Sequence, residues 1–273
     1  MFSLEGKTCV VTGAGKGIGR GICRAFAAQG AHVVGAARSD SDLDALAAEV
    51  TAAGGSIAVR PTDVTDANQL ERLGSFAQEK FGQIDVWVNN AGGFAPDAES
   101  QTEMIAVKES TIEAMFRLNI TAQILGAQVG ARAMRASGRG GLILFMSSID
   151  SLYAAPGGEG VYAACKAALN SLTQTMAIEL GQFRIRVNAI APAVVMTPLT
   201  SPWFPDEAVR RERSSFYPLG RLGEPQDIAA AAVYLASDEA AWVSGAVLLI
   251  SGGAVFTSDP YRYLMKLAGR PPS

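Results

Sequence analysis

The eight residues TGAGKGIG at positions 12–19 stand between a short apolar run and a segment with helical spacing. A strict GxGxxG pattern does not fit, because no glycine stands three residues after Gly15. The glycines instead fit TGxxxGxG, at Gly13, Gly17 and Gly19. Such glycines allow a tight turn and a close approach of the backbone to a pyrophosphate, which binds at the helix N-terminus. The sequence therefore predicts a dinucleotide-binding turn, and the alternative is a glycine-rich turn without a ligand.

The rest of the chain continues this alternation of strand and helix. Short apolar runs predict seven strands, at 8–11, 32–37, 57–60, 85–89, 141–147, 184–190 and 246–250. Helical spacing predicts helices at 18–28, 41–53, 66–81, 111–136, 161–180 and 225–236. Alternation of this kind is typical of parallel strands joined by helical crossovers. The predicted fold class is α/β, with a Rossmann-like, doubly wound, seven-stranded parallel sheet flanked by helices on both faces.

We expect one dinucleotide-binding and catalytic domain over residues 1–273, because α/β folds often reach this length with a single core. Two connections, at about 93–110 and 192–222, are longer than the others and follow strand ends. Long loops at that edge of a sheet usually carry substrate contacts. A C-terminal tail is expected at 254–273.

Composition excludes several classes of protein. Hydrophobic residues make up 49% and charged residues 18% of the chain, which suits a sheet buried on both faces and excludes a disordered or fibrous chain. The net charge is −3 and the basic residues are scattered, so we expect no nucleic-acid partner. No apolar run approaches the roughly 18 residues that span a bilayer, so we expect no membrane partner either.

Cysteine and histidine usage bears on compartment and on metal binding. Cys9, Cys23 and Cys165 have no metal-ligand spacing and are predicted to be buried, reduced thiols. Because the N-terminus also has no secretory signal pattern, we expect a cytoplasmic protein. The single histidine, His32, stands beside an apolar strand, where a structural role is expected. A multi-histidine metal site is therefore not expected.

Four motifs follow one another along the chain: TGxxxGxG, Asn89-Asn90-Ala91-Gly92, Tyr162-Ala-Ala-Cys-Lys166, and Pro192 with Thr197. In this order, over residues 4–253, the chain resembles the short-chain dehydrogenase/reductase family. The resemblance implies an oxidoreductase that interconverts a carbonyl and a secondary alcohol by hydride transfer with a nicotinamide cofactor. Taken alone, a YxxxK motif occurs by chance on many surface helices, so the inference depends on all four motifs.

Tyr162 and Lys166 are four residues apart in a predicted helix and therefore share one face. A free tyrosine has a pKa near ~10, and a nearby positive charge lowers the pKa of such a phenol. We therefore expect Lys166 to activate Tyr162. In the family the tyrosine is the general acid/base, and the lysine also holds the nicotinamide ribose, so both residues are expected to bind the cofactor too.

Two further catalytic residues follow from the resemblance. Ser148 stands fourteen residues before Tyr162, one more than is commonest in the family, and is expected to hydrogen-bond the substrate oxygen. Ser147 remains the alternative, because a shift of one residue would exchange the two side chains. Asn119 matches the family asparagine whose backbone holds a water linked to the lysine. It lies about five residues further along than expected, which implies an insertion in 95–110.

The resemblance also implies a set of cofactor contacts. The glycine turn would hold the pyrophosphate, Asp63 and Val64 would lie beside the adenine, and Val195 and Thr197 would contact the nicotinamide carboxamide. An Asp before a helix is also a good helix N-cap, so Asp63 has a second interpretation. The predicted contacts are Gly13, Lys16, Gly17, Ile18, Gly19, Asp63, Val64, Asn90, Ala91, Gly92, Tyr162, Lys166, Val195 and Thr197.

Residues after the second strand predict a preference for NADP(H) over NAD(H). Sites that prefer NAD normally place an Asp or Glu there, on the ribose 2′-hydroxyl. This chain has Arg38 and Ser39 at that place, and Lys16 in the glycine turn can add a second positive charge. The combination resembles the NADPH-dependent carbonyl reductases of the family. The alternative is that Asp40 reaches the ribose or pairs with Arg38, which would favour NAD(H).

Two departures from the family pattern concern the far end of the site. Pro192-Ala193 stands where the family has Pro-Gly, and Ser251 stands where an acidic residue is expected before Gly252-Gly253. A second hypothesis for the whole protein is a nucleotide-binding redox sensor without turnover. That hypothesis predicts loss of the tyrosine, lysine or serine, and all three are present. A third is a relative that catalyses dehydration or epimerisation.

The two long loops contain apolar side chains that favour a mainly apolar carbonyl or alcohol substrate. The same side chains are also suited to packing the loops onto the body of the protein. They are Phe94, Met196, Leu199, Trp203, Phe204, Phe216 and Tyr217. The resemblance implies a homo-oligomer, most simply a tetramer, because the family associates through its fourth and fifth helices. The matching segments 111–136 and 161–180 contain small and apolar residues beyond one inward stripe, which agrees with this expectation.

Overall fold

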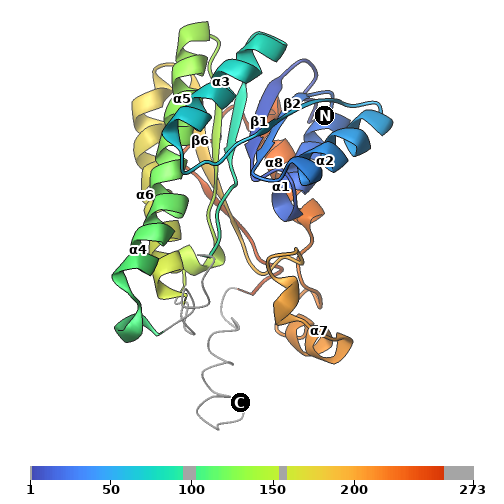
Figure 1. The fold of residues 1–273 in the computed structure, drawn as a ribbon, viewed down its shortest axis with the longest axis vertical. Coiled ribbons are helices and arrows are strands. Elements are labelled where there is room, and N and C mark those ends of the chain that lie inside the picture. Colours follow the sequence, from blue (N-terminus) through green and yellow to red (C-terminus); the bar gives the residue numbers. More distant parts are fainter. Residues whose placement is uncertain (1, 95–102, 154–158, 255–273) are drawn as a thin grey trace.

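A computed structural model describes residues 2–94, 103–153 and 159–254. Seven strands form one parallel sheet in the order β3-β2-β1-β4-β5-β6-β7 (Figure 1). The strands are β1 (Thr8–Thr12), β2 (His32–Ala37), β3 (Ser56–Pro61), β4 (Val86–Asn89), β5 (Gly141–Met146), β6 (Ile185–Pro192) and β7 (Val247–Ile250). The predicted fold class is confirmed, and each predicted strand lies within two residues of its observed bounds.

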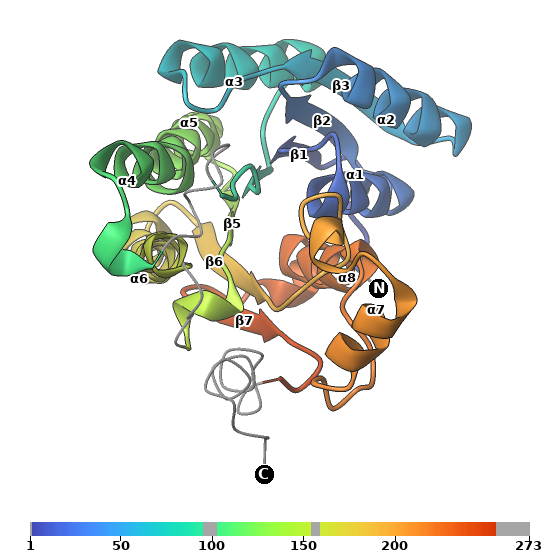
Figure 2. The ribbon, with the colours of Figure 1, turned by 60° about the horizontal axis from the view of Figure 1, so that its bottom comes forward.

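Helices cover both faces of this sheet (Figure 2). One face carries α1 (Gly17–Ala28), α2 (Asp40–Ala52) and α8 (Pro225–Ala236). The other carries α3 (Ala67–Phe81), α5 (Ala122–Ser137) and α6 (Gly160–Gly181). The two faces arise from the alternation of side chains along each strand. On β1, Val11 packs under α1, whereas Val10 belongs to the core on the opposite face.

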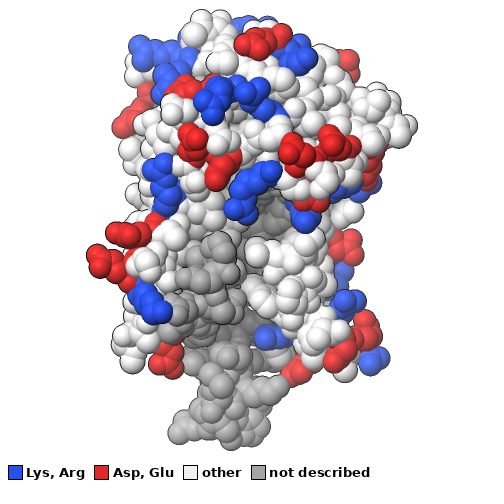
Figure 3. Space-filling view, in the orientation of Figure 1, with Lys and Arg blue, Asp and Glu red and all other residues white. Residues whose placement is uncertain are grey.

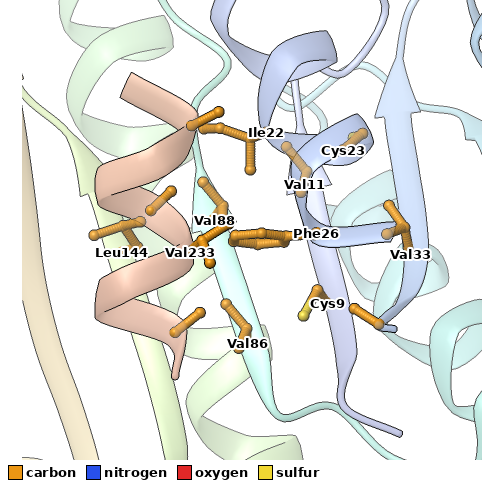
Figure 4. Close-up of a cluster of buried hydrophobic side chains, with 14 of the residues drawn as sticks. Cys9, Val11, Ile22, Cys23, Phe26, Val33, Val86, Val88, Leu144 and Val233 are labelled. Atoms are coloured by element: carbon orange, nitrogen blue, oxygen red, sulfur yellow. The ribbon is translucent and has the colours of Figure 1, made fainter. Parts of the chain in front are cut away.

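The buried core under α1 and α8 contains one fully buried aromatic ring, that of Phe26. Phe26 of α1 is fully buried and lies among the valines of β1 and β4 (Figure 4). Cys9 and Cys23 belong to the same cluster, and both are free and buried, as is Cys165 on α6. The predicted burial of the three cysteines is therefore confirmed, and none of them is paired in a disulfide.

The predicted helix at 111–136 is interrupted, which corrects the sequence-based expectation. The structure has α4 (Glu109–Phe116), a π-helical turn at Arg117–Thr121 and then α5. A π turn inserts one residue without changing the apolar composition of the segment, so the periodicity gives no sign of it. The turn contains Asn119, which is fully buried.

The connection 192–222 also contains structure that was not predicted. Helix α7 (Glu207–Ser214) begins after Asp206, whose carboxylate accepts a hydrogen bond from the Val209 N–H at 2.9 Å. Its polar composition hid it, because no apolar stripe marks the segment. Four short 3₁₀ turns complete the described chain: Met104–Ala106, Ile149–Ser151, Ser201–Trp203 and Asp238–Ala240. Half of the segment 95–110, where an insertion is expected, and nearly all of the expected tail lie outside the described residues, at 95–102 and 255–273.

His32 has the structural role that the sequence predicted. Its Nδ1 lies 2.9 Å from Ser56 Oγ, and its ring stacks on Phe81 with 4.9 Å between the centroids. Among the described residues, no group of three His, Cys, Asp or Glu side chains is arranged to hold a metal ion.

Within residues 2–94, 103–153 and 159–254, no helix has the length and apolarity needed to cross a bilayer. Figure 3 shows basic and acidic side chains interspersed over the visible face of the molecule.

Candidate active site

A cleft of about 1210 Å³ lies where the strands end. Strand order reverses between β1 and β4, and a crevice opens beyond the carboxyl ends of the strands at such a point. The cleft is lined by most of the residues that the sequence predicted: Gly13, Lys16, Gly17, Ile18, Arg38, Ser39, Asp63, Val64, Asn90, Ala91, Gly92, Ser148, Tyr162, Lys166, Val195 and Thr197. Gly19 and Asn119 are not in its lining.

Backbone crowding explains the first and last glycines of the turn. Gly13 has a φ of 67°, and a Cβ there would lie 2.8 Å from Asn90 Nδ2. At Gly19 a Cβ would lie 2.2 Å from the Gly13 carbonyl oxygen. Gly19 therefore supports the turn from behind, without facing the cleft.

The N-terminus of α1 is suited to an anion. Lys16 is its N-cap residue and makes no side-chain capping hydrogen bond, and the first turn contains no acidic residue. Free N–H groups and the helix dipole at such an end attract a phosphate. The turn is therefore chemically suited to the pyrophosphate of a dinucleotide.

Asn90 connects the glycine turn to the loop after β4. Its Nδ2 donates to the Thr12 carbonyl at 2.9 Å, and its backbone N–H donates to Thr12 Oγ1 at 3.0 Å. The side chain of Asn90 is therefore engaged with the protein, although the residue lines the cleft. Its role is to hold the two phosphate-side loops together.

The loop after β6 closes over the glycine turn. Thr197 packs against Gly17, where an added Cβ would lie 3.1 Å from the threonine Cβ. Thr200 Oγ1 donates to the Val195 carbonyl at 2.6 Å and accepts from the Thr197 N–H at 3.0 Å. The sequence did not predict this role of Thr200, because it depends on a loop conformation that no local pattern shows.

The pocket after β2 contains a carboxylate that the sequence analysis did not single out. Lys16 Nζ lies 3.2 Å from Asp42 Oδ2, whereas the exposed Asp40 begins α2. A hydrogen bond with Ser39 lowers the pKa of the Asp42 carboxyl most, and a hydrogen bond from Lys16 lowers it further, so this group is ionised at neutral pH. Asp42, and not Asp40, is therefore the acidic residue beside Lys16.

Asp63 and Val64, which follow β3, line the same cleft. One Asp63 oxygen accepts from the Thr65 N–H at 2.9 Å and from the Thr65 hydroxyl at 2.8 Å. Asp66, and not Asp63, caps α3 by accepting from the Asn68 N–H at 2.8 Å. The alternative reading of Asp63 as a helix cap is therefore wrong.

Tyr162 and Lys166 lie one helical turn apart at the start of α6, as their spacing predicted. Lys166 Nζ is 5.3 Å from the centre of the Tyr162 ring and donates to the Met146 carbonyl at 2.8 Å. The lysine is 3% exposed, and this burial lowers its pKa to about 8. It therefore remains mostly charged at neutral pH.

The expected lowering of the Tyr162 pKa is not what the protein's own groups produce. Burial raises the pKa of the phenol well above its usual range, and the charge of Asp150 raises it further, while a hydrogen bond with Ser148 lowers it. Lys166 is not among the groups that lower this pKa, so its charge does not offset the loss of water. By itself the chain keeps Tyr162 protonated.

The two serines after β5 point to different partners. Ser147 Oγ is 2.7 Å from Asn170 Oδ1 and 3.2 Å from the Lys166 carbonyl, so it joins β5 to α6. Ser148 Oγ instead hydrogen-bonds Asp150 and interacts with Tyr162. The geometry therefore brings Ser148, rather than Ser147, to the tyrosine.

Asn119 supports the site from behind. Its Nδ2 donates to the Gly93 carbonyl at 2.8 Å and its Oδ1 accepts from the Gly93 N–H at 3.0 Å. At Gly92 a Cβ would lie 2.9 Å from Asn119 Oδ1 and 3.3 Å from Lys166 Nζ. Asn119 thereby fixes the loop after β4 close to the lysine.

Aromatic side chains form the wall beside the tyrosine. The Phe94 ring lies 4.8 Å from that of Tyr162 and 6.0 Å from that of Trp203. Trp203 is half-buried, Phe204 and Tyr217 are almost fully buried, and all three line the cleft. Met196 and Phe216 pack against the same loop cluster and are not in the cleft lining. The loop aromatics therefore form both a local core and part of the cleft wall.

Comparisons with known proteins agree with this geometry. The family described as enoyl-(acyl carrier protein) reductase matches residues 13–255. The 3-oxoacyl-[acyl-carrier-protein] reductase of Thermotoga maritima is 38% identical over 92% of this chain and 99% of its own. The L-rhamnose 1-dehydrogenase (NAD(P)(+)) of Azotobacter vinelandii is 40% identical over 92% of this chain and 97% of its own.

Solved structures give the same result. A 7α-hydroxysteroid dehydrogenase complexed with NADH and 7-oxo glycochenodeoxycholic acid has a TM-score of 0.85 and 35% identity, covering 93% of this chain and 96% of that one. A short-chain type dehydrogenase/reductase from Mycobacterium marinum has a TM-score of 0.86 and 32% identity, with 93% and 98% covered. With its fold, its cleft and these relatives, the chain belongs to the short-chain dehydrogenase/reductase family of oxidoreductases, enzymes that act on CH–OH groups.

Proposed function

We propose that the protein is an NADP(H)-dependent oxidoreductase that interconverts a carbonyl and a secondary alcohol, with Tyr162 as general acid/base. The observation that carries the proposal is that one cleft contains two features. These are the N-terminus of α1, which has no side-chain cap, and the side chains of Ser148, Tyr162 and Lys166. The nicotinamide supplies or accepts the hydride when it is bound. The residues of this chain must therefore hold the substrate oxygen and move its proton.

In the direction of reduction, the Tyr162 hydroxyl donates its proton to the oxygen that develops negative charge. Its raised pKa suits this role, because the phenol is fully protonated at neutral pH. Ser148 holds the same oxygen by a hydrogen bond that strengthens in the transition state. Lys166 supplies a buried positive charge within reach of the phenol and, on the family pattern, holds the nicotinamide ribose.

The preference for NADP(H) is supported by Arg38. This exposed side chain follows β2, beside the N-terminus of α2, where Ser39 is the N-cap residue. A guanidinium and a helix N-terminus together suit a 2′-phosphate. Asp42 partly neutralises Lys16, so Arg38 is the main discriminating charge in this proposal. An NAD(H)-dependent dehydrogenase is the competing function, favoured by the NADH in one structural relative and by Asp42.

A mainly apolar carbonyl or alcohol is the proposed substrate class. The support is the wall of Phe94, Leu199 and Trp203 beside Tyr162. The relatives named above act on acyl, sugar and steroid compounds, so the family alone does not decide the substrate. We also propose a cytoplasmic location, supported by three free, buried thiols.

Tyr162→Phe is expected to reduce kcat by about 10²–10⁴-fold, because it removes only the transferable proton. The Kd of NADPH, measured by fluorescence quenching, should change less than about twofold, since the ring and its packing remain. Tyr234→Phe on α8 is the matched control and should retain activity. Near-normal kcat in the Tyr162 variant would disprove the mechanism, whereas absent turnover of all carbonyls by the wild type would favour the redox sensor.

Arg38→Ala should lower the ratio of kcat/KM with NADPH to that with NADH by roughly ten- to a hundredfold, the value of one charge-assisted hydrogen bond. Asp42→Asn should raise the same ratio, because it frees Lys16. Arg24→Ala on α1, which removes an ion pair with Glu49 on α2, is the matched control. A wild type that prefers NADH, or an unchanged ratio in the Arg38 variant, would contradict the assignment.

Trp203→Ala should raise KM for the true substrate by about two- to tenfold through loss of aromatic contacts, with no change in the Kd of the nucleotide. Trp203→Phe should recover most of this loss. Phe204 is less informative, because it is 2% exposed and its truncation would also destabilise the loop. Equal effects on the KM and the nucleotide Kd would make the loop purely structural.

A homotetramer is proposed from apolar side chains that the single chain leaves exposed. Ile112 and Phe116 on α4 and Ile178 on α6 are 36%, 44% and 83% exposed. Light scattering at micromolar concentration should give a mass near four times 28.5 kDa. Ile178→Asp should lower this mass by burying a charge in the interface. A wild-type mass of one chain would contradict the proposal.

A further inference from the structure

Asp150 is a carboxylate in the substrate part of the cleft for which the reaction described above has no role. It lies in the 3₁₀ turn Ile149–Ser151, directly after the end of β5, and lines the cleft. Its Oδ2 accepts a hydrogen bond from Ser148 Oγ at 2.9 Å. Its backbone N–H donates to the same Ser148 oxygen at 3.2 Å. The serine expected to hold the substrate is therefore bonded twice to one residue.

A hydroxyl has one proton to donate, and three acceptors compete for that of Ser148. They are the Asp150 carboxylate, the Tyr162 oxygen and the oxygen of a bound substrate. An ionised carboxylate forms hydrogen bonds roughly twice as strong as a neutral oxygen does. While Asp150 is ionised, the serine proton is directed to it and away from a carbonyl substrate.

A protonated Asp150 has the opposite effect. Its O–H then donates to Ser148 Oγ, and the serine proton becomes available to the substrate oxygen. We propose that Asp150 is a positioning residue that sets the direction of the Ser148 hydroxyl, so that its neutral form favours carbonyl reduction. The inference rests on the proposed function, because it requires Ser148 to act on the substrate oxygen.

The turn that carries Asp150 is fixed to α6, so the backbone of Ser148 cannot move away from the Asp150 carboxyl group. Ser151 Oγ donates to the Ser148 carbonyl at 2.5 Å and accepts from Asn170 Nδ2 at 2.8 Å. Asn170 is also bonded to Ser147, on the other side of Ser148. The backbone around Ser148 is thus held on both sides, and the orientation of its hydroxyl is the remaining freedom.

Burial raises the pKa of the Asp150 carboxyl above its ordinary value, and the bond from Ser148 offsets part of the rise. Other titratable groups of the described chain also line this part of the cleft. They are Tyr153 after the turn, Glu159 at the N-cap of α6, Tyr162 and Lys166 on α6, and Arg213 on α7. As pH rises through the pKa of Asp150, the carboxyl ionises and Ser148 donation is lost. Carbonyl reduction should therefore be fastest below that pKa.

The test is the pH profile of kcat/KM for carbonyl reduction with saturating NADPH. The wild-type kcat/KM should fall by roughly ten- to a hundredfold as pH rises, from a plateau at acid pH to a lower plateau at alkaline pH. The shape of the fall should fit the titration of one group. Asp150→Asn keeps the size of the side chain, and its amide can donate to Ser148 at every pH. This variant should lose the fall and exceed wild type on the alkaline side. Glu159→Gln, the other carboxylate near Tyr162, should keep it.

A second pair of variants separates action through Ser148 from action on Tyr162. In a Ser148→Ala background, the change Asp150→Asn should no longer alter the profile, because the residue acts through the serine. Retention of the wild-type fall in Asp150→Asn would overturn the inference. So would an effect of equal size in the Ser148→Ala background, which would assign it to the charge of Asp150 on Tyr162. Either result leaves the proposed function intact if Tyr162→Phe is inactive, whereas an active Tyr162→Phe would refute that function.

Discussion

The contact between the loop after β1 and the loop after β4 is the constraint on which the cleft depends. Asn90 holds both with hydrogen bonds to Thr12, and Gly13 has no room for a side chain beside it. Strand order reverses between β1 and β4, so the chain turns in opposite directions after these two strands. The crevice between the two loops therefore opens beyond the carboxyl ends of the strands. The phosphate turn on one side and the tyrosine helix on the other are positioned from this contact.

Burial of Lys166 is the second determinant of the site. A lysine removed from water costs several kcal/mol unless its donors are satisfied. Here the Met146 carbonyl accepts one hydrogen bond, and the Asn119 side chain lies close by across Gly92. The π turn in the helix places Asn119 at this point. The irregular helix and the buried charge are therefore parts of one arrangement.

The surroundings of Tyr162 favour the protonated form of its phenol. Loss of water and the Asp150 charge outweigh the hydrogen bond with Ser148. Such an environment suits an acid that donates to a developing alkoxide, and it opposes the reverse reaction at any pH below the raised pKa of the phenol. In the proposed mechanism, the short segment that follows β5 therefore influences both proton transfer and substrate holding.

By itself the sequence determined the seven strands, the glycine turn and the sharing of one helix face by Tyr162 and Lys166. These follow from local periodicity and spacing, which adjacent residues decide. The π turn, helix α7, the Lys16–Asp42 pair and the different partners of Ser147 and Ser148 appeared only in the tertiary structure. The Lys16–Asp42 pair and the partners of the two serines depend on contacts between different segments, and the π turn depends on a one-residue change of register. Helix α7 has no apolar stripe, so periodicity does not reveal it. Burial, which reversed the expected direction of the Tyr162 pKa, is likewise a property of the packed chain.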